Sequence, residues 1–471
     1  MVSAVLFITF FVLLVLNVPI SVCLGLSSAA AILYSGTSLT IVATNIYSGI
    51  SKFLLLAIPF FVLSGNIMAK AGISTRLIRF VDTCVGHRKG GIANVCIIVA
   101  CFFGAISGSG PATVAALGAV LIPAMVERGG FSAAFSTALM ATSSSIAIVI
   151  PPSIAFVVYA SITGVSIGDM FMAGIIPGIL MGLALVVVVM LEVRRNHVVP
   201  STVEKASAKE RWNAFKDAFW GFLMPVIILG GIYGGIFTPT EAAAVSVVYG
   251  LFVGMIIYKE VKFKDLWEIL IDSAKTTGGI MLIVACASLF SFVCTRFGIS
   301  TAASELLARV AGNQFTFLLI CNIIFLIAGC FIDANSAMYI FIPIMLPVCK
   351  ALGYNVIAFG IMATVNLAIG QVTPPVGVNL FVAIGIKLRD GIRVTLQEIS
   401  RAVVPMVAAS IVVLLIITYI PQISTCLPAA LGSAAAIENG ETAGGDSGTT
   451  QTDNDDFNTI GDYSDLDWAD M

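Results

Sequence analysis

The residues most able to do chemistry lie at two proline pairs inside otherwise apolar segments. The first pair begins at Pro151 and follows a run of three serines that ends at Ser145; the second begins at Pro374 and follows Thr373. A proline pair removes two backbone donors and pushes the preceding residue out of helical geometry, so each pair should break a helix. Inside a membrane the freed carbonyls need partners, and in transporters such breaks often hold a coupling cation. Two breaks of this kind therefore predict a binding site.

Two polar stretches between apolar arms precede the proline pairs. The first contains Ser107, Gly108 and Ser109, and the second runs from Asp333 to Ser336. Each stretch separates apolar runs that are shorter than the about 20 residues needed to cross a membrane. This pattern predicts two re-entrant helical hairpins, whose tips end near the middle of the membrane.

Asp333 is the most informative single residue of the two tips. An ionisable side chain inside an apolar segment is costly and points to function by default, here to a role with a cation or a substrate. The alternative is an aspartate that ends a helix at the membrane interface. The corresponding position in the first half is Ser109, at the other tip, which favours the functional role.

The composition excludes a soluble protein. Of the 471 residues, 59% are hydrophobic and 11% are charged, whereas an ordinary soluble domain carries roughly a quarter charged residues. A polytopic all-α membrane protein is therefore expected. The ten cysteines contain no C-x-x-C pair, and two histidines are too few for zinc or triad chemistry. Because no H-E-x-x-H or G-x-S-x-G motif occurs, an enzyme is not expected.

The C-terminal end differs in charge from the rest of the chain. After Ile437 there are ten acidic residues and no basic one. This stretch is rich in Gly, Thr, Asn and Asp, the composition of a solvated extension that cannot build a packed core. An acidic disordered tail is therefore expected over 421–471.

The chain contains an internal repeat. Ser109 aligns with Asp333 and Pro123 with Pro347 at an offset of 224 residues, and the proline pairs align at an offset of 223. Each half contains, in order, spans, an amphipathic helix, a hairpin, a broken helix and a span. If each half crosses the membrane an odd number of times, the two halves are inverted relative to each other.

Three motifs together resemble a known family. They are S-G-S-G-P-A-T-V-A-A-L-G at 107–118, G-I-F-T-P-T-E-A-A-A at 235–244 and the proline pairs. In combination they are similar to the large (M) membrane subunit of tripartite ATP-independent periplasmic (TRAP) transporters, over roughly residues 1–420. The acidic tail is not part of the resemblance.

The resemblance implies a fold, a function and partners. It implies an elevator-type secondary transporter of the ion-transporter superfamily, in a bacterial inner membrane, with two inverted repeats. Sodium would drive the uptake of an organic acid such as sialic acid or a dicarboxylate, and no organic cofactor would be needed. A small membrane (Q) subunit and a periplasmic substrate-binding protein would be its partners, and nucleic acid would not be one.

The same resemblance assigns roles to the segments. Scaffold helices are expected at 1–70 and 219–258, and the two halves of a moving transport domain at 91–191 and 315–420. The remaining segments are amphipathic arm helices at 73–89 and 262–275, a polar connecting loop at 192–217 and connector helices at 280–310.

Sodium prefers oxygen ligands, which unwound carbonyls supply without burying full charges. The first sodium site is expected where the first tip meets the first break, at Ser107, Gly108, Ser109, Ser144, Ser145, Ile150 and Pro151. The second is expected at Gly329, Asp333, Asn335, Gly370 and Thr373. A substrate carboxylate favours free N–H groups at helix N-termini, which places the substrate at Pro111, Thr113, Asn335, Ser336, Pro375 and Asn379.

Two other functions stay open at this point. The first is a self-sufficient sodium–dicarboxylate symporter of the same superfamily, which would work without a binding protein. The second is an ion channel, because hairpins and broken helices also line pores. Two inverted sites without a ring of like charges favour alternating access over a channel.

Overall fold

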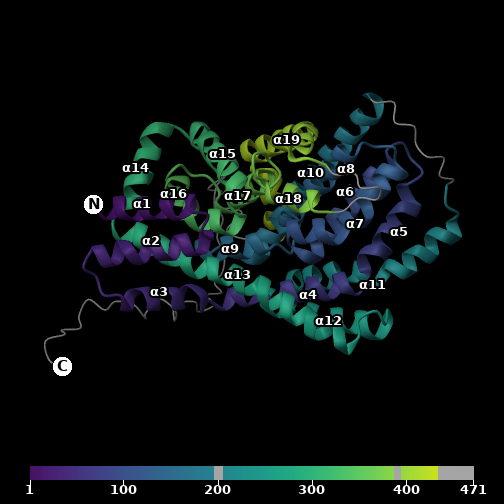
Figure 1. The fold of residues 1–471 in the computed structure, drawn as a ribbon, viewed down its shortest axis with the longest axis horizontal. Coiled ribbons are helices and arrows are strands. Elements are labelled where there is room, and N and C mark those ends of the chain that lie inside the picture. Colours follow the sequence, from purple (N-terminus) through teal and green to yellow (C-terminus); the bar gives the residue numbers. More distant parts are fainter. Residues whose placement is uncertain (196–204, 387–393, 433–471) are drawn as a thin grey trace, which may run out of the picture.

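The computed structural model describes residues 1–195, 205–386 and 394–432, and every regular element in these ranges is helical (Figure 1). Residues 433–471 of the expected tail, residues 196–204 of the expected polar loop and residues 387–393 lie outside the described residues. The expected bounds of both segments are corrected by helices: Gln422–Ala430 is helical at the start of the expected tail, and a capping box of Ser207 and Glu210 starts a helix at Ala208, inside the expected loop. Nine of the described helical segments are long and apolar enough to cross a membrane. The expected all-α polytopic class is thereby confirmed.

The first half forms a hairpin followed by a broken helix. The hairpin consists of α6 (Gly91–Ser107) and α7 (Gly110–Glu127). The broken helix consists of α8 (Ala133–Ser145) and α9 (Ile154–Thr163), and α10 (Ile167–Arg195) completes the half. Serine side chains accept backbone hydrogen bonds at the start of α8 and of α9, which is a preferred way to begin a helix.

The second half repeats this order. Its hairpin consists of α15 (Gln314–Phe331) and α16 (Ala334–Ala351). Its broken helix consists of α17 (Val356–Gly370) and α18 (Val378–Ile384), and α19 (Leu396–Tyr419) completes the half. Both proline pairs contain a cis peptide bond. The hairpins and broken helices therefore lie where the sequence predicts them.

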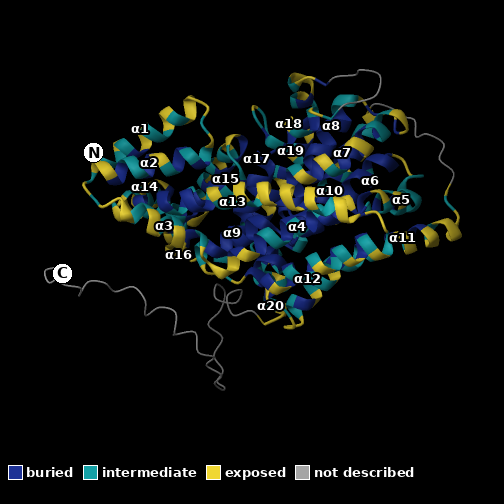
Figure 2. Ribbon diagram, turned by 60° about the horizontal axis from the view of Figure 1, so that its bottom comes forward, coloured by how far each residue is buried: buried dark blue, intermediate teal, exposed yellow. Residues whose placement is uncertain are grey.

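The core surrounds the first arms of the two broken helices. Every residue of α8 from Phe135 onward is buried, and so is every residue of α17 from Ile357 onward. A helix that is covered on all sides has to be apolar or small-polar all round, as both are. Buried residues fill the middle of the molecule, whereas most residues of peripheral helices such as α11 (Ala208–Tyr233) are intermediate or exposed (Figure 2). The two proline breaks therefore lie next to the best-packed part of the chain.

The remaining helices lie outside the two halves of the expected transport domain, 91–191 and 315–420. Figure 1 shows α1 to α3 at one end of the long axis and α5 and α11 toward the other end. Their bounds are α1 (Val2–Val15), α2 (Ile20–Tyr34), α3 (Thr40–Ile50), α4 (Ala57–Lys70), α5 (Ile73–Val85), α12 (Pro239–Leu251), α13 (Phe263–Arg296), α14 (Ile299–Ala311) and α20 (Gln422–Ala430). Short 3₁₀ turns cover Phe53–Leu56 and Ile146–Ile148, and a π-helical turn over Phe252–Ile257 continues α12.

α13 differs from the expected division into an arm at 262–275 and separate connectors. It is one continuous helix of 34 residues that contacts α2, α3, α4 and α16. Gly278 and Gly279 lie inside it, and the helix contains no proline. Glycine lowers helix stability by only about 1 kcal/mol relative to alanine and keeps its backbone donor, so packing along the helix can outweigh it.

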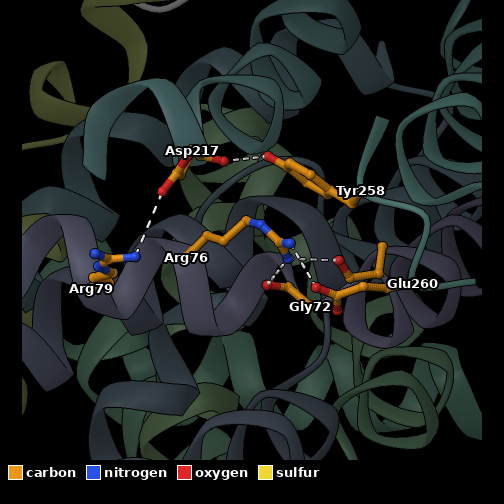
Figure 3. Close-up of polar contacts among 7 residues, drawn as sticks. Gly72, Arg76, Arg79, Asp217, Tyr258 and Glu260 are labelled. Carbon is orange, nitrogen blue, oxygen red and sulfur yellow. Dashed lines mark hydrogen bonds and ion pairs between the residues drawn. The ribbon is translucent and has the colours of Figure 1, made fainter. Parts of the chain in front are cut away.

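The amphipathic helix α5 is held at its N-terminal end by a group of polar contacts (Figure 3). The Arg76 guanidinium donates to the Glu260 carboxylate at 2.6 Å and to the Gly72 carbonyl at 3.1 Å, and it stacks on the ring of Tyr258. The Tyr258 hydroxyl donates to the Asp217 carbonyl at 2.6 Å, and burial raises the pKa of this hydroxyl to about 12. These contacts attach α5 to the segment that follows α12, and Tyr258 in turn attaches that segment to α11.

The other end of α5 contacts the first hairpin. Arg128, just after α7, donates to the Asp82 carboxylate at 2.9 Å. α5 also packs against α6 and α11 along its length. One amphipathic helix therefore connects the hairpin of the first half with helices outside that half.

Candidate transport site

Both hairpin tips line one cavity of about 380 Å³. Residues of α13 line it too, so the cavity lies between the two hairpins and this helix. Its residues come from the first tip, the first and second breaks, α9, the second tip and α13. They are Gly108, Ser109, Gly110, Pro111, Ile148, Ile154, Ala155, Lys275, Thr276, Gly279, Ile280, Ile283, Asp333, Ala334, Asn335 and Gln371. Three of the expected site residues of the first tip (Gly108, Ser109 and Pro111) and two of the second tip (Asp333 and Asn335) therefore share one space.

The first tip is held together by hydroxyl groups. The hydroxyls of Ser107 and Thr113 are hydrogen-bonded to each other at 2.8 Å. The Thr113 hydroxyl also lies within donor distance of the Ser109 carbonyl, at 2.8 Å. Ser107 and Thr113 are buried. Thr113, an expected substrate residue, therefore supports the tip from inside and does not line the cavity.

The first tip touches the first break at Gly108. This glycine has a φ of +59°, and a Cβ built on it would lie 2.8 Å from the Pro152 carbonyl oxygen. Ser109 starts α7, yet its side chain makes no capping hydrogen bond within the described residues. The first tip thus approaches the unwound segment closely at the Gly108 backbone, where a side chain would meet the Pro152 carbonyl.

The serines before the first break bond mainly to their own helix. Ser144 donates to the Ala141 carbonyl at 2.6 Å and Ser145 to the Thr142 carbonyl at 2.8 Å. Ser144 also accepts a hydrogen bond from the Asn379 amide of α18 at 3.2 Å. This bond joins the two halves directly, because the partners are 235 residues apart.

The second tip is organised by a charged cap. One carboxylate oxygen of Asp333 accepts from the backbone amides of Asn335 and Ser336, at 3.0 and 3.1 Å. The other accepts from the Ser336 hydroxyl. Asp333 therefore caps α16 and is also one of the residues that line the cavity, and its role with a cation or a substrate stays a prediction.

The second tip touches the second break more closely than the first tip touches the first break. A Cβ built on Gly370 would lie 2.5 Å from the Gly329 Cα, and Gly377 donates its amide to the Cys330 carbonyl at 3.2 Å. Thr373 turns back and donates to the Ile369 carbonyl at 2.7 Å. Gly329, Gly370 and the break are therefore brought together as the sequence predicts.

Several buried amide oxygens around the tips have no hydrogen-bond partner among the described residues. They are Oδ1 of Asn335, Oε1 of Gln371 and Oδ1 of Asn379. Gln371 and Asn379 lie together, since a Cβ on Gly110 would meet both side chains, at 3.2 and 2.7 Å. A buried acceptor left without a donor is costly, about 1–3 kcal/mol, so such oxygens fit the hard-cation ligands expected here.

Four more of the expected residues do not line the cavity. The Ile150 side chain packs against α10, where a Cβ on Gly178 would lie 2.4 Å from it. Pro151 and Pro375 do not belong to the described lining of the cavity, and Pro375 is exposed. Ser336 is buried in the α16 cap.

The structure adds residues that sequence reasoning missed. Gln371 directly precedes the second break, and a polar residue in that apolar run was a usable signal. Lys275 and Thr276 reach the cavity from α13. Their sequence surroundings contain no signal for this, because the approach of α13 is a tertiary contact.

A second cavity of about 350 Å³ adjoins the first. The two share Ser109, Ile154, Thr276 and Ile280. The second one extends between α4 and the first hairpin and is lined mainly by apolar side chains such as Val62. Both cavities are lined mainly by apolar side chains, and the polar groups of the joined space come from the tips, the second break, α13 and Asn66 of α4.

Residues 7–423 match the family described as "Tripartite ATP-independent periplasmic transporter, DctM component". A C4-dicarboxylate TRAP transporter large permease protein from Rhodobacter capsulatus is 38% identical over 436 residues, which are 89% of this chain and 97% of the relative. The isethionate TRAP transporter permease protein DctMQ from Oleidesulfovibrio alaskensis is 40% identical over 89% of this chain and 65% of its own length. Two further TRAP transporter large permease proteins, from Vibrio cholerae and Escherichia coli, are 35% and 34% identical to this chain and are named for sialic acid and 2,3-diketo-L-gulonate.

Among solved structures, the chain is similar to the YdaH transporter of Alcanivorax borkumensis. The TM-score is 0.59, with 14% sequence identity, and the match covers 83% of this chain and 88% of that one. At this identity the likeness concerns the fold alone. It agrees with the helical transporter architecture described above.

Proposed function

The chain belongs to the family of the DctM component of tripartite ATP-independent periplasmic (TRAP) transporters, and we propose that it carries an organic acid across the bacterial inner membrane, coupled to sodium. Membership makes it a multi-pass transporter subunit and not an enzyme. Its relatives are named for C4-dicarboxylates, sialic acid, 2,3-diketo-L-gulonate and isethionate. All of these are organic anions, which supports that class of substrate.

One observation carries the proposal: the two hairpin tips meet at a single cavity. Each tip starts a helix whose N-terminal end faces this space, at Gly110 and at Ala334. At the start of α16, the Asp333 carboxylate already accepts from the amides of Asn335 and Ser336. At the start of α7, free N–H groups and the helix dipole favour a negative group. A carboxylate bound there would contact both halves at once.

Sodium coupling is supported by the oxygen atoms around the tips. Gly108 faces the Pro152 carbonyl in the first half, and Gly329 faces Gly370 in the second. The buried amide oxygens of Asn335 and Gln371 add side-chain acceptors without formal charge. We assign the first ion to the first tip and break and the second ion to the second pair, with Asp333 as the charged ligand.

An elevator movement is supported by the contacts of α5. Its N-terminal end is tied by Arg76 to Glu260, beyond α12, and its C-terminal end is tied by Asp82 to Arg128 of the hairpin. A helix attached in this way to two bodies can follow a displacement of one body relative to the other. The scaffold would then include α4, α11 and α12, and both hairpins and broken helices would move.

The partners follow from the same family. The relative named DctMQ is longer than this chain, and its name joins an M and a Q component. We propose that a separate small membrane subunit takes the place of that additional part here. A periplasmic binding protein would deliver the acid to the face on which the cavity opens.

Uptake by reconstituted vesicles tests this function. The chain is reconstituted alone, then with its small subunit and binding protein, and offered labelled succinate, N-acetylneuraminate, isethionate and pyruvate with and without an inward sodium gradient. Accumulation of one acid that needs sodium and all three proteins is the expected result. Sodium-driven uptake by this chain alone would instead identify a self-sufficient symporter. Flux that follows the voltage without sodium would identify a channel.

A further inference from the structure

α13 presents one face to the cavity between the tips. The lining residues of this helix are Lys275, Thr276, Gly279, Ile280 and Ile283. Their spacing is one, three, one and three residues, so they lie on a single side of the helix. α13 also contacts α2, α3 and α4, outside the two halves. One wall of the cavity is therefore contributed by a helix that belongs to neither hairpin.

The cavity contains one group of each charge among the described residues that line it. Lys275 is the cation and Asp333 is the anion. The Asp333 carboxylate accepts three hydrogen bonds at the start of its own helix, from two amides and the Ser336 hydroxyl. Its negative charge is therefore already stabilised by the α16 terminus, and its available bonds are largely used.

Lys275 is free to change partners. Its one ion pair is with Asp272, three residues earlier on the same helix, at 3.4 Å. The two side chains are 73% and 58% exposed, and an exposed pair of this kind stabilises a protein by about 0–1 kcal/mol. A carboxylate that enters the cavity can therefore replace Asp272 at little cost.

We propose that Lys275 binds the anionic group of the transported acid, and that it sets the preference of this site for anions over neutral molecules of the same shape. This inference rests on the proposed function. The ammonium group would donate to a carboxylate or sulfonate oxygen on the α13 side, while the N-terminal end of α7 faces that group from the first tip. The less polar part of the acid then has room in the adjoining cavity toward α4.

The first test compares Lys275→Gln with Lys275→Arg in the reconstituted complex, using whichever acid of the panel wild type transports. Lys264→Gln is the matched control, because Lys264 lies on the same helix and outside the cavity lining. Lys275→Gln is expected to raise KM about tenfold with Vmax within about twofold, while Lys275→Arg and Lys264→Gln stay near wild type. A KM for Lys275→Gln equal to that of Lys264→Gln would overturn the inference.

The second test separates charge recognition from a structural effect. The transported acid and its amide analogue compete with the labelled acid, and the ratio of their inhibition constants is measured for each variant. Wild type is expected to prefer the acid strongly, and Lys275→Gln is expected to lose about tenfold of that preference. If the ratio of inhibition constants is the same in Lys275→Gln as in wild type, Lys275 does not contribute to the preference for the anion.

Two controls keep the failures distinguishable. Equal thermal unfolding midpoints in detergent for the three variants confirm that each is folded. If wild type transports no organic acid, the proposed function fails. If wild type transports an acid and Lys275→Gln transports it with the same KM and the same preference, only this inference fails.

Discussion

The two hairpin tips have the same backbone plan and different chemistry. The first is neutral: hydroxyls of Ser107 and Thr113 bond to each other, and Gly108 meets the break through its backbone. The second carries a charge, because Asp333 takes the place of Ser109 at the start of the second helix. The repeat thus preserves the fold of the site in both halves but places its fixed negative charge in one.

This difference assigns unequal roles to the two sites. A site of neutral oxygens stabilises a cation through several weak dipoles, whereas a carboxylate adds a full charge whose effect is larger in a partly buried place. We therefore expect the second site to depend on one side chain and the first on the arrangement of the backbone.

The largest effect is expected for Gly370→Ala. The new Cβ would lie 2.5 Å from the Gly329 Cα and 2.6 Å from its carbonyl carbon, and backbone atoms cannot rotate away. Overpacking of this kind costs about 1–3 kcal/mol or more, so we expect loss of uptake together with a lower unfolding midpoint. Gly278→Ala is the control, since no atom lies within 4 Å of its Cβ position. Normal uptake and stability for Gly370→Ala would show that the second tip and break are not in contact.

The next effect separates the charge of the second tip from its capping role. Asparagine also caps helices, so Asp333→Asn should keep α16 in place and remove only the charge. We expect the sodium concentration for half-maximal uptake to rise about tenfold, because charge-assisted contacts are roughly twice as strong as neutral ones.

Ser109→Ala is the matched change in the first tip. Its hydroxyl makes no capping bond with the described residues, so we expect a shift of at most about threefold in the same measurement. If the two variants shift the sodium dependence equally, the proposed asymmetry between the tips is contradicted.

The smallest effect is expected at the bond that links the halves. Removing the Asn379 amide by Asn379→Ala, or its acceptor by Ser144→Ala, should lower stability by about 1 kcal/mol in each case. The double variant should lower the free energy of unfolding by about 0.5 kcal/mol less than the sum of the two single variants. Unfolding in a denaturing detergent measures all three values. Strict additivity would mean that this hydrogen bond contributes nothing.

Much of the fold could be predicted because its signals are local. Proline pairs end helices wherever they occur, and the breaks after Ser145 and Gly370 followed from that rule alone. The tips could be located because Ser109 and Asp333 interrupt apolar runs. The internal repeat then supported the predicted order of helices in both halves, because each helix from α6 to α10 has a counterpart from α15 to α19.

The rest depends on contacts between distant segments. The bond from Asn379 to Ser144 joins residues 235 positions apart, and no local pattern marks it. The expected boundary after Lys275 failed to appear because packing along α13 outweighs the cost of Gly278 and Gly279. Lys275 could not be recognised for the same reason, since its place beside the tips exists only once α13 is continuous.

The most direct test of the account is the sodium dependence of acid uptake in vesicles that contain the complete complex. For wild type we predict uptake that requires sodium and rises with its concentration in a cooperative way, as two ion sites imply. For Asp333→Asn we predict the same maximal uptake at a sodium concentration about tenfold higher. Uptake of the acid at an unchanged rate without sodium would contradict the central claim that the two tips form ion sites coupled to transport.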